Sequence, residues 1–132
     1  MSRKEDIADA MTTADLWKMM RRRVPPIVAE YFRGGADSES TLRGNVRAFQ
    51  ESLTTAYGAI KFDDLDMRTT TVGHDLAIPW FVTPVGSLRT LWPMGDAVAS
   101  QVAGEFGTVM AQSTLSGTPL EDVSGASKGS CW

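Results

Sequence analysis

The sequence has very few residues that bind metals or form cross-links. It contains one cysteine, Cys131, and one histidine, His74, among 132 residues. A single cysteine cannot form an internal disulfide, and one thiol with one imidazole falls short of the ligand set of a structural zinc site. We therefore predict no metal site and no disulfide framework.

Long apolar runs and a strong excess of one charge are also missing. The longest apolar run, residues 77–82, is far shorter than the ~20 residues that span a bilayer. No apolar signal segment follows the polar residues 2–6, so we expect a cytoplasmic protein, with a peripheral inner-membrane position left open for a longer parent. The net charge of -3, from 13 basic and 16 acidic residues, gives no general attraction to nucleic acid.

The rest of the composition is that of an ordinary globular domain. Hydrophobic residues make up 42% of the chain and charged residues 22%, which excludes a wholly disordered or collagen-like protein. The length allows one domain of typical size.

The first 55 or so residues predict helices. Thr12 or Thr13 can cap a helix that includes residues 14–20. Residues 25–26, both proline, end this helix and start a second one, which the glycine pair 34–35 terminates.

A third helix is predicted by its apolar spacing. Asp37 or Ser38 is its expected N-terminal cap. Apolar residues recur at spacings of four, three and four, which predicts one apolar stripe on a helix. The stripe consists of Leu42, Val46, Phe49 and Leu53.

The second half of the chain predicts strands. A β-branched run at 69–72, a turn at 73–75 and a second run at 76–78 indicate a β-hairpin. Strand, loop and helix then alternate, an order typical of a parallel α/β fold. The expected elements are strands at 80–83 and 108–111, a helix from 95–96 to Gly104 or Gly107, a helical turn at 119–123, and the start of a third strand at 131–132.

Two strands and the start of a third leave a parallel sheet unfinished. Parallel sheets are normally covered by helices on both faces and flanked by further strands. We therefore expect the chain to be the N-terminal part of a larger enzyme. A small complete α/β domain with an edge strand is the alternative.

Several motifs in a fixed order make the likeness specific. They are residues 31–45, residues 66–73, residues 79–86, residues 93–96, and residues 107–108, 113–116 and 120–123. Together they strongly resemble the FMN-dependent α-hydroxy acid dehydrogenases, the family of glycolate oxidase, lactate oxidase, L-lactate dehydrogenase, mandelate dehydrogenase and flavocytochrome b2. The likeness extends from about residue 16 to Trp132.

The resemblance implies a fold of the α/β class. The chain would be the N-terminal part of a (β/α)₈ TIM barrel, preceded by helices and a β-hairpin. Its parts would be a helical lead-in at about residues 1–55, a hairpin at about 66–78, and the first βα units at about 79–132, with the remainder of the barrel absent.

The same resemblance implies roles for six residues. Pro84, Val85 and Gly86 match a loop whose backbone lies against the flavin ring, and Ser113 matches a serine that hydrogen-bonds the flavin. Tyr31 matches a tyrosine that contacts the substrate carboxylate, although its position alone favours a half-buried core tyrosine with its hydroxyl at the surface. Leu115 matches a substrate-pocket position, where leucine leaves more room than tryptophan and so favours a substrate larger than glycolate.

The implied activity belongs to a longer parent. It is the oxidation of an L-2-hydroxy acid, lactate-like, to a 2-oxo acid by hydride transfer to FMN, with oxygen, a quinone or a cytochrome as electron acceptor. The parent would be a homo-oligomer, a tetramer. The family's catalytic histidine and phosphate-binding segment have no counterpart here, and His74 falls in the hairpin, so we expect the isolated chain to be inactive.

Two alternatives have other functional consequences. The chain can be an inactive truncated remnant of such an enzyme. The basic run at residues 21–23, between two helices, can also mimic a helix-turn-helix nucleic-acid module. Two observations argue against nucleic-acid binding. The net charge of the chain is negative, and the prolines at 25–26 interrupt the helix where base-contacting residues would have to lie.

Overall fold

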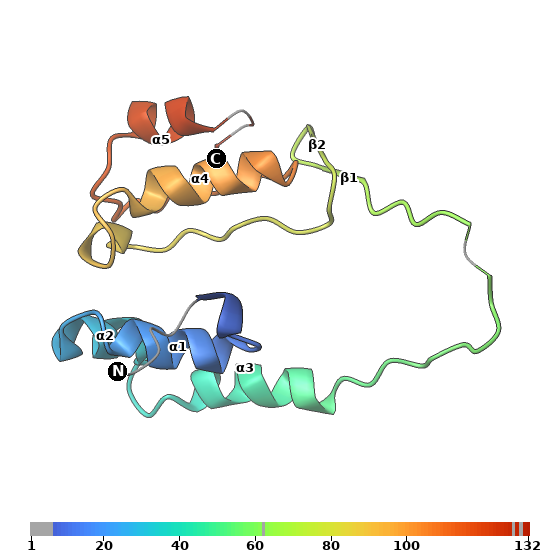
Figure 1. Cartoon of the computed structure of the whole chain (residues 1–132), viewed down its shortest axis with the longest axis horizontal. Coiled ribbons are helices and arrows are strands. Elements are labelled where there is room, and N and C mark those ends of the chain that lie inside the picture. Colours follow the sequence, from blue (N-terminus) through green and yellow to red (C-terminus); the bar gives the residue numbers. More distant parts are fainter. Residues whose placement is uncertain (1–6, 62, 128, 130) are drawn as a thin grey trace. The chain divides into compact units, whose positions relative to one another are not determined.

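The computed structural model describes residues 7–61, 63–127, 129 and 131–132 (Figure 1). The chain divides into two compact units, Met1–Ile60 and Lys61–Trp132, and each is described by itself. The first unit is helical, and the second combines helices with short stretches of sheet.

The first unit contains the three predicted α-helices. The bounds are α1 Thr13–Arg21, α2 Pro26–Arg33 and α3 Ser40–Glu51, preceded by a short 3₁₀ turn, η1 Ile7–Asp9. Thr12 caps α1, since its side-chain oxygen accepts a hydrogen bond from the Asp15 backbone N–H at 3.2 Å. The α1–α2 contact buries Met19 and Ala29.

The expected cap of α3 is wrong. The helix begins after Glu39 rather than after Asp37 or Ser38, and the Glu39 backbone is left-handed, with φ 56°. Its carboxylate accepts a hydrogen bond from the Gly35 N–H at 3.2 Å instead of capping the helix. Asp37 also has a positive φ of 50°, so the chain enters α3 through a tight turn that no side-chain cap signal reveals.

The apolar stripe of α3 forms but is not buried within its unit. No described residue of α3 is buried, and Phe49 is 87% exposed. Leu53 lies beyond the helix end at Glu51 and is 92% exposed. The spacing therefore predicted the helix correctly, while the described residues of the unit leave most of this stripe uncovered.

The second unit opens with the predicted hairpin, with a corrected turn. Strand β1, Thr69–Thr71, pairs antiparallel with β2, His74–Leu76. The turn is Val72–Gly73, with φ 50° and 76°, and not 73–75. Two left-handed residues are what a two-residue hairpin turn of matching twist requires. His74 therefore lies in a strand, opposite Thr71.

Three parallel segments follow, which we name the first (80–83), second (108–111) and third (131–132) segments. Isolated parallel bridges join Val82 to Met110 and Met110 to Cys131. The predicted parallel neighbours are thus confirmed, although each segment contributes a single bridged residue rather than a regular strand. The described part of the chain shows helices and a small sheet, not a closed barrel.

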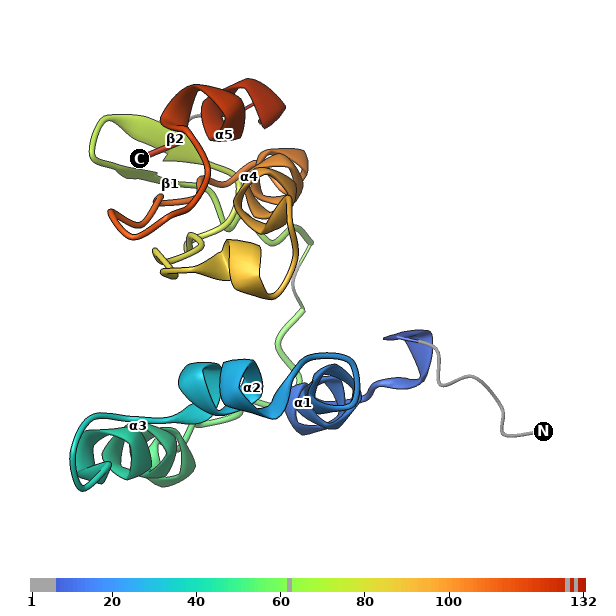
Figure 2. The same ribbon diagram turned by 90° about the vertical axis from the view of Figure 1, so that its left-hand side faces the viewer.

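Helices connect and cover these segments. The elements are η2 Leu88–Thr90, which the sequence did not predict, α4 Gly95–Glu105, as predicted, and α5 Leu120–Ala126, which extends past the predicted turn. Helices α4 and α5 lie side by side (Figures 1 and 2). The core of the unit includes Ala97 and Ala103 of α4, Met110 of the second segment and Val123 of α5.

Candidate functional site

Two loops meet at the carboxyl edge of the parallel segments. Residues 84–87 follow the first segment and residues 112–117 follow the second. The backbone N–H of Ser87 donates to the Leu115 carbonyl oxygen at 3.1 Å, which joins the loops directly. The carboxyl edge of parallel strands is where α/β enzymes place their active sites.

Gly86 allows this close approach. A Cβ built on Gly86 would lie 3.2 Å from the Leu115 Cβ and 3.6 Å from the Ser113 hydroxyl oxygen. The structure therefore brings together three of the residues that the sequence singled out, Gly86, Ser113 and Leu115. A larger residue at position 86 would push the two loops apart.

Three hydrogen-bond donors at this edge have no acceptor among the described residues. The Leu115 backbone N–H donates to the Ser113 Oγ at 3.1 Å, which leaves the hydroxyl proton of Ser113 available to an external acceptor. Among the described residues, no hydrogen bond involves the backbone N–H of Val85 or Gly86. Two backbone N–H groups and one O–H group of these loops are therefore available to an acceptor from outside the described chain.

A buried polar cluster supports the second loop. The carboxyl of Asp96, at the start of α4, is fully buried and accepts a hydrogen bond from the Thr118 hydroxyl at 3.1 Å. The Thr118 carbonyl accepts from Gln112 Nε2 at 2.8 Å, and Arg89 Nη1 donates to the Gly117 carbonyl at 3.0 Å. Sequence reasoning missed this cluster, although an acidic residue in the first turn of a helix is a visible signal.

Tyr31 belongs to the other unit, on α2. It is 60% exposed, and its ring packs edge-on against Phe32 with centroids 5.1 Å apart. Its hydroxyl has no hydrogen-bond partner among the residues that the structure describes. Its role at the site stays a prediction.

His74 lies near the amino end of the second segment. The hairpin is attached there by the Ala77 N–H, which donates to the Gly107 carbonyl at 2.8 Å, just before the segment begins. The imidazole packs against the indole of Trp132, with centroids 5.6 Å apart. His74 also lines a hollow with Gly107 and Thr108, at the end of the second segment away from the 112–117 loop.

The described residues form neither a metal-binding cluster nor a membrane-spanning helix. Within residues 7–61, 63–127, 129 and 131–132, no group of three or more His, Cys, Asp or Glu side chains could hold a metal ion. In that same described part, no helix is long and apolar enough to cross a bilayer.

Comparison with known proteins decides the family. The sequence profile described as FMN-dependent dehydrogenase matches residues 20–132, most of the chain. The chain belongs to the FMN-dependent dehydrogenase family. The resemblance stated from the sequence motifs is thereby confirmed, and FMN is the cofactor of this family.

Curated relatives of this FMN-dependent dehydrogenase chain include enzymes of two names. L-lactate dehydrogenase of Actinobacillus pleuropneumoniae serotype 3 is 33% identical over 121 residues, which cover 92% of this chain and 32% of the relative. Peroxisomal (S)-2-hydroxy-acid oxidase of Oryza sativa subsp. indica is 27% identical over 106 residues, covering 80% and 29%. The chain thus spans about a third of the length of the curated relatives it matches.

A solved structure agrees with the fold. A soluble mutant of the membrane-associated (S)-mandelate dehydrogenase from Pseudomonas putida superposes with a TM-score of 0.85 at 25% identity. The match covers 94% of this chain and 36% of that chain. The fold is therefore consistent with a part of the barrel of FMN-dependent dehydrogenases.

The edge described above fits an FMN ring in chemical terms. A flavin ring carries along one side two carbonyl oxygens and the nitrogens N1 and N5, which accept hydrogen bonds, together with an N3–H group, which donates one. The N–H groups of Val85 and Gly86 and the hydroxyl proton of Ser113 are donors of the kind that the acceptors of this ring require. We found no competing internal partner for these groups among the described residues.

Proposed function

We propose that this chain forms part of the flavin and substrate site of an enzyme that oxidises an L-2-hydroxy acid, lactate-like, to a 2-oxo acid. The observation that carries the proposal is the junction of the loops at Gly86, Ser113 and Leu115, in a chain of this family. The names of its relatives, L-lactate dehydrogenase and 2-hydroxy-acid oxidase, support the substrate class.

The chain's own residues would hold and orient the cofactor. The backbone of Pro84, Val85 and Gly86 would lie along the flavin ring, with the N–H groups of residues 85 and 86 donating to its polar edge. Ser113 would donate its hydroxyl proton, while the Leu115 N–H holds the Ser113 oxygen in place. When bound, FMN supplies the hydride acceptor, and the protein contributes orientation and electrostatics.

Two residues would meet the substrate. Leu115 is 67% exposed at the loop junction and would form an apolar wall for the substrate side chain. Tyr31 would donate its hydroxyl proton to the substrate carboxylate, and its lack of an internal partner in the described chain leaves that proton available. The size of the leucine favours a substrate with a side chain larger than that of glycolate.

The activity is a property of a longer polypeptide in this proposal. A hydroxy acid must lose its hydroxyl proton to a base, and the chain's one histidine is at the other end of the second segment, in the hairpin. The electron acceptor (oxygen, a quinone or a cytochrome), the tetrameric state and the cytoplasmic location stay predictions. The isolated chain is expected to purify colourless and to leave L-lactate unoxidised.

A chimera tests the residue roles. This chain would replace the matching segment of the Actinobacillus pleuropneumoniae L-lactate dehydrogenase. Ser113→Ala removes one hydrogen bond worth a net ~1 kcal/mol, so FMN should bind about fivefold more weakly. Ser124→Ala, at an exposed serine of α5, is the matched control and should leave FMN affinity unchanged.

The second arm of this test addresses the substrate. Tyr31→Phe should leave FMN affinity as it is and lower kcat/KM for L-lactate, because only the substrate contact is removed. Unchanged FMN affinity in Ser113→Ala, or unchanged kcat/KM in Tyr31→Phe, would contradict the corresponding role.

A further inference from the structure

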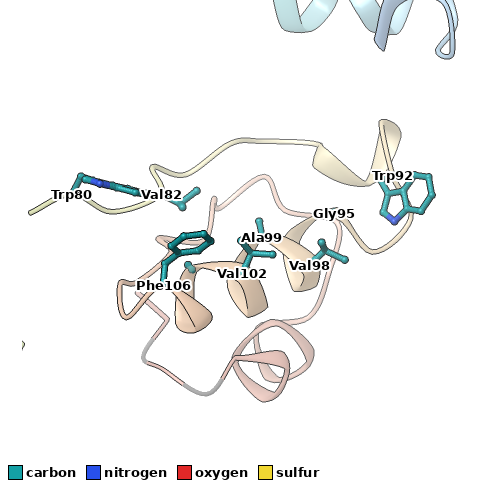
Figure 3. Close-up of a pocket in the computed structure, with 9 residues that line it drawn as sticks. Trp80, Val82, Trp92, Gly95, Val98, Ala99, Val102 and Phe106 are labelled. Atoms are coloured by element: carbon teal, nitrogen blue, oxygen red, sulfur yellow. The ribbon is translucent and has the colours of Figure 1, made fainter. Parts of the chain in front are cut away.

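Helix α4 buries polar groups on one face and leaves apolar side chains half-exposed on the other. Figure 3 shows Val98 and Val102 directed toward the extended chain of the first segment, and they are 45% and 43% exposed in this unit. Asp96, Ser100 and Ala103 recur at spacings of four and three, which places them together on the opposite face, and all three are buried. The buried face of a helix is normally apolar, so the buried carboxyl of Asp96 indicates a role beyond packing.

The Asp96 carboxyl holds the residue that ends the 112–117 loop. Thr118, directly after this loop, donates its hydroxyl proton to Asp96 Oδ2 at 3.1 Å. Gln112, at the start of the loop, donates from Nε2 to the Thr118 carbonyl at 2.8 Å. Both ends of the loop therefore meet at Thr118, and the hydrogen bond to Asp96 joins Thr118 to α4.

Hydrogen bonds within the loop lead from Thr118 to Ser113. The Thr118 N–H donates to the Ser116 hydroxyl oxygen at 3.2 Å, and the Ser116 N–H donates to the Ser113 carbonyl oxygen at 2.9 Å. The Leu115 N–H donates to the Ser113 Oγ at 3.1 Å. A displacement of Thr118 would therefore strain or break the contacts that hold Ser113.

The pair of Asp96 and Thr118 is better suited to fixing a position than to adding stability. Removing a carboxyl group from water is costly, and among the described residues Asp96 Oδ1 has no hydrogen-bond partner to offset that cost. Apolar groups of the same shape in place of both members of a buried pair are often nearly neutral for stability. A hydrogen bond, unlike an apolar contact, restricts both distance and direction. The polar pair therefore points to a need for one defined position of Thr118.

We propose that Asp96 is a positioning residue of the flavin site. By holding Thr118 in one place it fixes the 112–117 loop, and the loop directs the Ser113 hydroxyl toward the flavin. Asp96 itself touches neither cofactor nor substrate in this proposal. The consequence for FMN rests on the proposed function, whereas the dependence of the loop on Asp96 rests on the hydrogen bonds alone.

The FMN affinity of the chimera with the Actinobacillus pleuropneumoniae L-lactate dehydrogenase is the first readout. Asp96→Ala and Thr118→Val remove the same hydrogen bond from its two sides. Each should weaken FMN binding at least about fivefold, the loss expected when one hydrogen bond to the flavin is misplaced. Asp96→Asn keeps a carbonyl oxygen for the Thr118 hydroxyl and should restore the affinity to within about twofold of the parent chimera.

A double-mutant cycle shows whether the effect of Asp96 passes through Ser113. In a Ser113→Ala background the hydrogen bond to the flavin is already lost, so Asp96→Ala should change FMN affinity less than about twofold. Val123→Ala is the control for a general loss of stability, because it opens a cavity at a fully buried side chain of α5, outside the loop. It should leave FMN affinity unchanged.

A proton contact in the full 132-residue chain gives a readout without FMN. The Gly86 backbone approaches the Leu115 side chain closely, so a nuclear Overhauser effect between their protons reports the place of the loop. This effect should be present in the wild-type chain, in Asp96→Asn and in Val123→Ala. It should be lost in Asp96→Ala, because Thr118 is no longer held.

The outcomes separate the two claims. Unchanged FMN affinity in Asp96→Ala and Thr118→Val, full additivity with Ser113→Ala, or an equal loss of affinity in Val123→Ala would overturn the positioning role. Failure of Asp96→Asn to restore the affinity would overturn it as well. A folded chimera that binds no FMN would contradict the proposed function, and the proton contact would then decide the positioning role. Its loss in Asp96→Ala alone would support that role, and its persistence there would overturn it.

Discussion

Gly107 offers the sharpest stability test of the second unit. It ends α4 in the left-handed region, with φ +67°, and its carbonyl accepts the Ala77 N–H at 2.8 Å, which ties the hairpin to the second segment. A Cβ at this position would lie 2.7 Å from the Ala77 Cβ, a separation that real Cβ atoms essentially never show. Gly107→Ala must therefore move the backbone or break this connection.

The cost can be built from its parts. A left-handed conformation costs an alanine about 1–2 kcal/mol relative to glycine. Loss of the Ala77 hydrogen bond as the clash is relieved adds a net ~1 kcal/mol. The expected loss of stability is about 2–3 kcal/mol. This corresponds to roughly 30–150-fold lower protection of the backbone N–H groups of the second unit against hydrogen exchange.

The assay is amide hydrogen exchange of the 132-residue chain at the Ala111 N–H, which is hydrogen-bonded to Val82. Gly125→Ala is the matched control in the same unit, because a Cβ there meets nothing within 4 Å and lies in α5. That variant should be neutral or stabilising by up to ~1 kcal/mol. Equal protection of the Ala111 N–H in Gly107→Ala and Gly125→Ala would refute the reasoning. Adding Ala77→Gly to Gly107→Ala should restore the part of the protection that is lost through the Cβ clash.

Two other predictions concern buried groups of the same unit. Asp96→Ala leaves the Thr118 hydroxyl without its acceptor and should destabilise the unit by about 1–3 kcal/mol in urea unfolding. Glu121→Ala, at an exposed residue, is the control and should cause no comparable loss. Equal losses in the two variants would contradict a stabilising role of the buried Asp96 carboxyl. Burial raises the pKa of the Cys131 thiol, so the folded chain should be alkylated more slowly than the urea-unfolded chain until the pH exceeds the raised pKa. Because the folded state holds this proton more tightly, its contribution to stability is present at neutral pH and declines as the pH rises through the folded pKa; equal alkylation rates would contradict the burial.

Local signals predicted most of the secondary structure. The proline pair and glycine pair correctly bounded α2, and Thr12 correctly capped α1. The errors fall at positive φ angles. Glu39 and Val72 adopt left-handed backbones that these residue types rarely adopt, so a reading based on preferences placed the α3 cap and the hairpin turn elsewhere.

Long-range contacts mark the limit of prediction from the sequence. The α3 stripe was predicted from its spacing, but spacing does not say which surface covers it, and the described residues of this unit leave most of it exposed. The approach of Gly86 to Leu115 joins residues 29 positions apart, and the link from Asp96 to Thr118 joins residues 22 positions apart. The first of these sites was indicated only by the family resemblance, and the second was not anticipated.

We propose that this chain forms part of an FMN site that serves 2-hydroxy acid oxidation. The most direct measurement is the visible spectrum of the chimera with the Actinobacillus pleuropneumoniae L-lactate dehydrogenase, recorded without oxygen before and after L-lactate is added. We expect a yellow protein whose flavin absorbance is bleached by L-lactate. A folded chimera that purifies without flavin, or whose flavin stays oxidised in L-lactate and in larger L-2-hydroxy acids, would contradict it.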